Sequence, residues 1–220
     1  MLKIVKIAID TMIFDVDGTL VDSKKDIANA MNYTLRSLGI KEKSCATIAS
    51  YIGTGVKDLV RKSLGNGYLD LADKAEKIFT GYYIKHSAVE SRLYPHVKET
   101  LDHFKGKRKF ILTNRYRRFA EATLAELGIK DYFEDMLGGD DEYCMKPSAC
   151  ILDRMFSGLK IDKDKAMIVG DMAIDIETGK NSSIKTCWVT YGLGKKKDLR
   201  ALKPDYIIDD ISELKKIIFL

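Results

Sequence analysis

The sequence of 220 residues has no apolar run that approaches the roughly 20 residues a membrane-spanning helix needs. Its first ten residues, MLKIVKIAID, are largely apolar, but lysines interrupt them and no small-residue cleavage site follows. We therefore interpret this stretch as an early or edge strand. We expect a cytoplasmic protein that does not associate with membranes.

Cysteine and histidine are also scarce. No C-x-x-C pair occurs among the four cysteines, which are Cys45, Cys144, Cys150 and Cys187. Because no histidine cluster accompanies them, the pattern disfavours a zinc site or a disulfide framework and predicts reduced, mostly buried thiols. The three histidines match no serine or cysteine nucleophile motif, so we expect ordinary surface or packing roles for them.

A strong charge of either sign is missing as well. Lys and Arg together number 37 and Asp and Glu 32, which leaves a formal net charge of +5. This mild excess suits a small anionic molecule as the partner and is too diffuse to indicate nucleic acid binding. The composition, 45% hydrophobic and 31% charged, is typical of a globular protein with a real core.

What the chain does contain is an alternation of strand-like and helix-like segments. Short runs rich in Ile, Val, Phe and Leu, with little polar alternation, are typical of parallel strands covered on both faces. Such runs lie at 11–17, 109–114, 166–171, 185–192 and 205–209, with a weaker one at 135–140. Helical patterns lie at about 116–127, 147–158, 174–182 and 211–219. We predict an α/β fold with a Rossmann-like parallel sheet core wrapped by helices.

One long stretch interrupts this alternation. It contains no convincing strand: 25–40 and 70–89 are amphipathic, and 51–67 has the pattern of a glycine-bearing loop followed by a short helix. We predict an α-helical domain inserted after the first strand. The predicted domains are a discontinuous core, residues 1–22 and 93–220, and a helical cap domain, residues 23–92. The apolar face of the inserted helices could pack on the core or partly on a second subunit, so a monomer and a homodimer both remain open.

Polar side chains follow the predicted strands. Because the carboxyl ends of parallel strands meet at one edge of the sheet, we expect residues at those ends to lie together. In chain order they are Asp15, Asp17, Thr113, Asn114, Lys146 (before Pro147), Asp171 and Asp175. Carboxylates this close repel one another unless a cation compensates. Several of them facing one lysine therefore suggest a hard divalent cation and a phosphoryl group.

The motifs DVDGT, LTN, KP and GDMAID occur in this order along the chain. In this respect the sequence resembles the phosphatases of the haloacid dehalogenase superfamily, and the resemblance extends over essentially the whole chain. It implies a Mg²⁺-dependent phosphatase that hydrolyses a small anionic phosphomonoester through an aspartyl-phosphate. The dehalogenases of the superfamily lack the second aspartate of the first motif, so Asp17 favours phosphoryl transfer.

The resemblance also implies a role for each acidic residue. Asp15 would be the nucleophile, and Asp17 would be the general acid and base. The Asp15 carboxylate, the Asp17 backbone carbonyl and Asp171 would bind Mg²⁺. For Asp175 three roles remain open: a place at or beside the metal, support of Lys146, or an ordinary helix cap.

Phosphate binding is implied for the polar residues between these acids. The Thr113 hydroxyl and the Asn114 backbone amide would bind phosphoryl oxygens, and Lys146 would neutralise the phosphate and the nucleophile. Gly18 permits a tight turn and a close backbone approach. Thr19 would orient Asp17.

The stretch YIGTGVKDLVRKSL resembles the cap loop of phosphoglycolate phosphatases. Gly53 and Gly55 would allow the backbone to approach the catalytic edge closely. Lys57 or Arg61 would meet a substrate carboxylate or a second phosphate. The alternative is that these two residues form the solvated face of a short helix.

Other activities remain open. A β-phosphoglucomutase-like phosphomutase would share the cap, which we expect to close on hinges near 23–25 and 91–94. A phosphonoacetaldehyde hydrolase would use a cap lysine as a Schiff base, and Lys57 has a suggestive position. A non-catalytic receiver-like phosphate-binding regulator would also have clustered aspartates and a lysine, but it needs neither Asp17 nor a lid. No G-x-G-x-x-G follows the first strand, which argues against a nucleotide-binding oxidoreductase.

Overall fold

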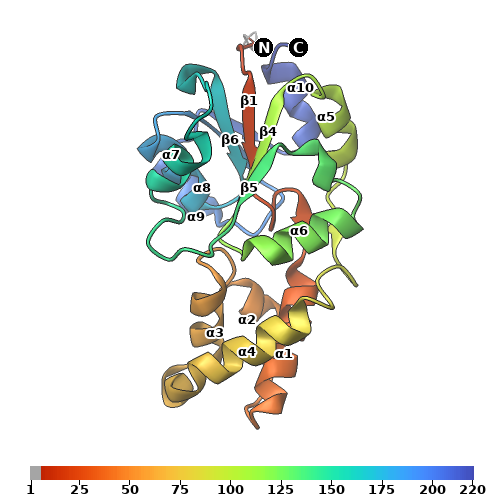
Figure 1. Cartoon of the computed structure of the whole chain (residues 1–220), viewed down its shortest axis with the longest axis vertical. Helices are drawn as coiled ribbons and strands as arrows, with labels where there is room; N and C mark the ends of the chain where they lie inside the picture. The colour runs from red at the N-terminus through yellow and green to blue at the C-terminus, as the bar shows by residue number, and fades with distance from the viewer. Residues whose placement is uncertain (1–5) are drawn as a thin grey trace.

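The computed structural model describes residues 6–220 and centres on a six-stranded sheet (Figure 1). Its strands run parallel in the order β5-β4-β1-β6-β7-β8. Their bounds are β1 Thr11–Phe14, β4 Arg108–Leu112, β5 Asp135–Leu137, β6 Ala166–Gly170, β7 Lys185–Val189 and β8 Tyr206–Ile208. The predicted α/β fold class is confirmed, and each of these strands overlaps one of the predicted strand segments.

Both faces of the sheet are buried. Along β1, Met12 and Phe14 join one apolar cluster, whereas Ile13 between them joins another. The helices packed on the first face are α5 (Val97–His103), α6 (Arg117–Glu126) and α10 (Leu214–Ile217), and those on the second are α7 (Cys150–Phe156) and α8 (Ala173–Asn181). This burial on two sides explains why the strands are apolar without alternation.

A group of helices lies at the opposite end of the molecule from the two termini, at the bottom of Figure 1. Its members are α1 (Lys24–Ser37), α2 (Cys45–Ala49), α3 (Val56–Leu64), the 3-10 helix η1 (Asn66–Leu71) and α4 (Ala72–Tyr83). They share an apolar cluster of their own, which also takes in Phe119 from α6. The chain enters and leaves this group through two short strands, β2 (Val21–Asp22) and β3 (Arg92–Leu93), which pair antiparallel. The helical group therefore faces the carboxyl ends of the sheet strands.

Several predicted boundaries differ from the observed ones. The helix predicted at 70–89 ends at Tyr83, and turns follow it. The helix predicted at 147–158 begins at Cys150, because the Asn114 side chain binds the backbone amide and carbonyl of Lys146 and holds this part outside the helix. A further helix, α9 (Lys196–Leu202), was not predicted.

The prediction of a strand within the first ten residues is wrong for residues 6–10, the part of this stretch that the structure describes. Ile7 forms a single parallel bridge to Ile218, in which the Ile7 amide donates to Ile217 and the Phe219 amide donates to Ile7. Ile7 pairs with a short segment that follows directly after α10. The pairing between the two segments is therefore limited to this one bridge. Residues 1–5 lie outside the described part of the chain.

The prediction of reduced, mostly buried thiols is wrong for two of the four cysteines, and Cys45, which is free, is exposed. Cys144 and Cys150 form a disulfide, with their Cα atoms 5.7 Å apart. Turn hydrogen bonds in this segment, such as that from the Ser148 amide to the Met145 carbonyl at 2.9 Å, bring the two cysteines together. Cys187 is free and buried in β7 as expected.

The helices of residues 6–220 include none with the length and apolar character required to cross a bilayer.

Candidate active site

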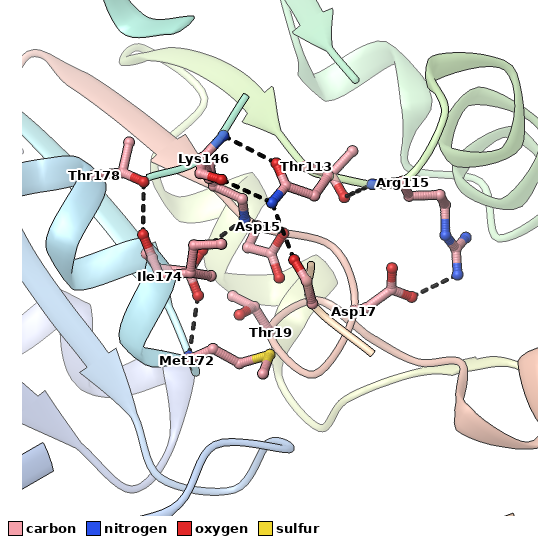
Figure 2. Close-up of polar contacts among 12 residues, drawn as sticks. Asp15, Asp17, Thr19, Thr113, Arg115, Lys146, Met172, Ile174 and Thr178 are labelled. Atoms are coloured by element: carbon pink, nitrogen blue, oxygen red, sulfur yellow. Dashed lines mark hydrogen bonds and ion pairs between the residues drawn. The ribbon is translucent and has the colours of Figure 1, made fainter. Parts of the chain in front are cut away.

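The polar residues that follow the strands gather at the carboxyl edge of the sheet (Figure 2). Asp15 and Asp17 follow β1, Thr113 follows β4, and Asp171 follows β6, while Lys146 lies in the segment before α7. All five are buried, with exposed fractions of 7% or less. Strands β4, β1 and β6 are neighbours in the sheet, and this order brings residues from distant parts of the sequence into one cluster.

Lys146 lies between two carboxylates. Its Nζ is 2.7 Å from Oδ1 of Asp15 and 2.6 Å from Oδ1 of Asp175. Burial disfavours the ammonium, but the two carboxylates outweigh this effect and raise the pKa of Lys146. Oδ2 of Asp175 accepts from the Met172 amide at 3.0 Å, which caps α8. Both oxygens of Asp175 thus have partners, and this residue holds Lys146 against Asp15.

Asp171 is held from two sides. Its Oδ1 accepts from the Thr19 hydroxyl at 2.9 Å, and its Oδ2 accepts from the Leu193 amide at 2.6 Å. Thr19 therefore orients Asp171 rather than Asp17, for which we had predicted this contact. Gly18 has a φ of +91°, and a Cβ atom on it would lie 2.3 Å from Asp171 Oδ2. Only glycine fits here without strain, both for its backbone conformation and for the space available.

The buried cluster carries an excess of negative charge. Its ionisable members are Asp15, Asp17, Asp171, Asp175, Lys146 and Arg115, with a formal charge of −2 when all are ionised. Burial, with repulsion from Asp175 and Asp17, raises the pKa of Asp15 to about 7 despite the nearby Lys146. Burial and the charges of Asp15 and Asp175 likewise raise the pKa of Asp171 well above its usual range.

A hard divalent cation fits this cluster. One carboxylate oxygen each from Asp15, Asp171 and Asp175 lies within 4.8 Å of the others. An all-oxygen donor set with two surplus negative charges matches what Mg²⁺ requires. Asp15 and Asp171 would hold the ion directly, while Asp175, bound to Lys146, would lie beside it.

Asp17 is paired with an arginine that sequence analysis did not single out. Its Oδ1 lies 2.5 Å from Nη2 of Arg115 (Figure 2). The same oxygen also accepts from the Ser23 hydroxyl. The Arg115 side chain is only 4% exposed, and its Nη1 donates to the Thr123 hydroxyl at 2.9 Å. Asp17 is therefore held toward Arg115, on the side of the cavity that also borders the helical group.

Asn114 joins three segments through its side chain. Its Nδ2 donates to the carbonyls of Gly53, at 3.0 Å, and of Lys146, at 3.1 Å, while its Oδ1 accepts from the Lys146 amide at 3.0 Å. Gly53 has a φ of +117°, and a Cβ atom on it would lie 2.7 Å from the Met172 side chain. The Thr113 hydroxyl accepts from the Arg115 amide at 3.2 Å, so its proton stays available to another acceptor. The Gly53 carbonyl thus lies next to Asn114 at the carboxyl edge of the sheet.

Lys57 and Arg61 lie apart from this cluster. Lys57 is exposed and forms an ion pair with Glu142, while Arg61 lines a neighbouring hollow together with Lys57. The cavity that contains Asp15 is lined instead by Gly53, Gly55 and other residues. The structure therefore does not bring either basic side chain of the cap to the carboxylates.

Three contributors to the site were missed by sequence analysis: Arg115, Tyr83 and Leu193. Arg115 directly follows the LTN motif and lines the same cavity as Asp15, as does Tyr83 at the end of α4. Leu193 lies in the loop after β7, where the strand-end argument used for the other residues also applies. That argument could have identified Arg115 and Leu193, but nothing in the sequence indicated that Tyr83 points toward the sheet.

Known proteins match this chain over nearly its full length. A sequence profile described as haloacid dehalogenase-like hydrolase matches residues 12–189. A phosphoglycolate phosphatase of Nitrosococcus oceani is 32% identical over 216 residues, covering 95% of this chain and 96% of its own length. One from Aquifex aeolicus is 33% identical over 208 residues, covering 94% and 95%. A crystal structure described as a predicted phosphoglycolate phosphatase from Haemophilus somnus has a TM-score of 0.89 and 28% identity, over 94% of this chain and 97% of that one.

Proposed function

Because the chain belongs to the haloacid dehalogenase-like hydrolases and is a phosphoric monoester hydrolase, we propose that it hydrolyses a small ester of the phosphoglycolate type. The observation that carries this proposal is the buried contact of 2.7 Å between Asp15 and Lys146 at the carboxyl edge of the sheet. A carboxylate held beside an ammonium in a water-poor site can attack phosphorus, because the cation offsets the repulsion between two anions. The names of the relatives support the substrate class.

The reaction would have two steps. Asp15 would attack the phosphorus and form an aspartyl-phosphate, while Asp17 gives a proton to the leaving oxygen. Asp17 would then take a proton from the water that cleaves the aspartyl-phosphate. Mg²⁺ held by Asp15, Asp171 and the Asp17 carbonyl would neutralise charge between nucleophile and phosphate.

Phosphate binding would fall to Thr113, Asn114 and Lys146. The Thr113 hydroxyl proton and the Asn114 backbone amide would bind phosphoryl oxygens, and Lys146 would contribute its charge. The Asn114 side chain would have a different task, since its three hydrogen bonds hold the Lys146 segment and the cap loop. Asp175 would keep Lys146 oriented.

We assign residues 23–92 to a cap domain and residues 1–22 and 93–220 to the catalytic core. The separate apolar cluster of α1–α4 supports this division. The paired strands β2 and β3 would act as the hinge region, because both connections pass through them. Closure of the cap would exclude bulk water while the aspartyl-phosphate forms.

The proposal is tested by measuring Mg²⁺-dependent phosphate release from an aryl phosphate, and then from phosphoglycolate, sugar phosphates, nucleotides and pyrophosphate. We expect turnover that chelation abolishes, with phosphoglycolate among the preferred esters. No turnover on any ester would instead favour a receiver-like regulator. Conversion of one sugar phosphate into its isomer without phosphate release would favour a phosphomutase.

A Schiff-base mechanism on Lys57 is not supported. A nucleophilic lysine needs a lowered pKa, so that its amine is neutral. The hydrogen bond and charge of Glu142 raise the pKa of Lys57, and the side chain is exposed. Lys57 therefore stays protonated and outside the cavity of Asp15.

A further inference from the structure

The cavity between the sheet and the helical group contains two polar side chains that the proposed phosphoryl transfer does not use. It is lined by Asp15, Asp17 and Lys146 on one side, and by apolar residues of α1, α3 and α4 on the other. The two additional polar residues are Arg115, after β4, and Tyr83, at the end of α4. Both are buried, with exposed fractions of 6% and 1%.

Tyr83 has a hydroxyl group without a partner. Among residues 6–220, its Oη makes no well-formed hydrogen bond, and the nearby Arg115 side chain can only donate, so the hydroxyl proton has no acceptor. Burial raises the pKa of Tyr83, so the hydroxyl keeps its proton and is a potential donor. A buried donor without an acceptor is unfavourable by itself, and an acceptor from a bound ligand would satisfy it.

Arg115 is beside Tyr83 and is paired with a residue that catalysis requires elsewhere. Its guanidinium lies 5.3 Å from the centre of the Tyr83 ring, and its Nη2 lies 2.5 Å from Asp17 Oδ1. When Asp17 turns to the leaving oxygen, Arg115 loses this counter-charge while still buried. An unpaired buried cation is costly, so another anion is needed in its place.

The geometry points to Arg115 and Tyr83 as a subsite for a carboxylate that the substrate carries next to its phosphate ester. This inference rests on the proposed function and assigns the residues that recognise the carboxylate of its substrate. The substrate carboxylate takes the place of Asp17 on the guanidinium and accepts from the Tyr83 hydroxyl. Asp17 is thereby released from Arg115 and turns toward the leaving oxygen, to which it passes a proton taken from solvent.

The chemistry favours a carboxylate over a second phosphate. The planar guanidinium fork matches a carboxylate, and the single Tyr83 hydroxyl can serve one further lone pair. A second phosphate would bring more negative charge than one arginine balances, since Lys146 already faces Asp15 and Asp175. The spacer must also be short, because Asp15, Asp17 and Arg115 line the same cavity.

The test compares two esters that differ only in the carboxylate: phosphoglycolate and ethyl phosphate. Their dissociation constants are measured by calorimetry with Mg²⁺ on Asp15→Asn, which cannot form the aspartyl-phosphate. The same background carries Arg115→Met, Tyr83→Phe or, as a control, Arg36→Gln, which removes an exposed arginine paired with Glu42. Turnover of both esters is measured separately with the unmodified protein.

We expect Asp15→Asn to bind phosphoglycolate roughly 10- to 100-fold tighter than ethyl phosphate, the range of a hydrogen bond to a charged group. Arg115→Met should remove most of this preference, Tyr83→Phe should reduce it about fivefold, and Arg36→Gln should leave it intact. Tyr83→Phe should also unfold at a higher temperature, because it deletes an unsatisfied buried group, and this variant decides the matter if Arg115→Met does not fold.

Two results would overturn the inference. One is a preference for phosphoglycolate over ethyl phosphate that stays unchanged in both Tyr83→Phe and Arg115→Met. The other is the absence of this preference in Asp15→Asn alone. If the preference is present but the unmodified protein hydrolyses neither ester, the subsite is supported and the proposed hydrolysis is refuted.

Discussion

Among single residues, Lys146 and Arg115 each bind one of the two aspartates of the DVDGT motif. Lys146 contacts Asp15, and Arg115 contacts Asp17, in both cases with almost complete burial. The strand-end argument placed both residues of the first pair at one edge of the sheet, because each comes after a predicted strand. It did not predict the second pair, because the argument was not extended to Arg115, the residue directly after LTN.

Substitution of the two aspartates separates their proposed roles. We expect Asp15→Asn to abolish turnover, because the amide cannot attack phosphorus, while the fold persists. Asp17→Asn should lower kcat by roughly 10²- to 10⁴-fold, the usual contribution of a positioned acid and base. Steady-state kinetics on an aryl phosphate measure both, with the exposed Asp73→Asn as the control. A rate close to that of the unmodified protein in either variant would contradict the assigned role.

The raised pKa of Asp15 predicts how Mg²⁺ and pH act together on stability. The pKa is about 7 in the folded protein against 3.8 ordinarily, so the folded state binds more protons than the unfolded state between these values. This stabilising contribution is complete at low pH and is lost as the pH rises through about 7. Because Mg²⁺ binds the ionised carboxylates, it should raise the melting temperature more at about pH 8 than at about pH 5.

Thermal unfolding with Mg²⁺ and with a chelator measures this difference. Asp15→Asn is the matched control, and in this variant the pH dependence of the Mg²⁺ effect should shrink. An Mg²⁺ effect of equal size at both pH values would contradict the prediction.

At the scale of elements, the loops after the strands hold most of the residues of the proposed site. The apolar runs predicted the positions of the strands, since burial on two faces requires continuous apolar sequence. They did not predict where each loop turns. The segment from Cys144 to Cys150 is held both by a disulfide and by the Asn114 side chain.

Because Asn114 holds Lys146 independently, loss of the disulfide should leave the site in place. We expect the double variant Cys144→Ser and Cys150→Ser to lose about 2 kcal/mol of stability, the chain-entropy estimate for so short a loop. Its kcat should remain within about threefold of the unmodified value, since the hydrogen bonds to Lys146 persist. Chemical unfolding and steady-state kinetics test this, with Cys45→Ser as the control. A collapse of kcat would show that the disulfide, rather than Asn114, positions Lys146.

At the scale of the whole molecule, the helical group touches the catalytic edge through a few polar contacts. Gly53 accepts from Asn114 at 3.0 Å, and Glu76 accepts from the Tyr116 hydroxyl at 2.5 Å. The two connections to the core are tied together at Asp26, a buried residue of α1. Its carboxylate accepts from the amides of Glu90 and Ser91 and from the Ser91 hydroxyl, at 2.7–3.0 Å.

We expect Asp26→Ala to destabilise the protein by about 2–4 kcal/mol, because it leaves several buried donors without an acceptor. Urea unfolding measures the loss, with the exposed Asp73→Ala as the control. A loss below about 1 kcal/mol, the value typical of a single ordinary hydrogen bond, would show that the carboxylate does not tie the two connections together.

The order and spacing of local patterns were sufficient to predict the parallel sheet, the inserted helices and the residues at the strand ends. These properties depend on apolar runs, on the periodicity of apolar residues and on short motifs. All three are visible in the sequence itself. The partners of Asp17 and Thr19, and the position of Tyr83 in the cavity, depended on the tertiary structure. Their contacts join the carboxyl edge of the sheet to segments far along the chain or to the helical group. No local sequence pattern predicts how such segments pack against each other. The local motif around Lys57 predicted a substrate contact. The packing of distant segments instead places Lys57 beside Glu142, outside the cavity of Asp15.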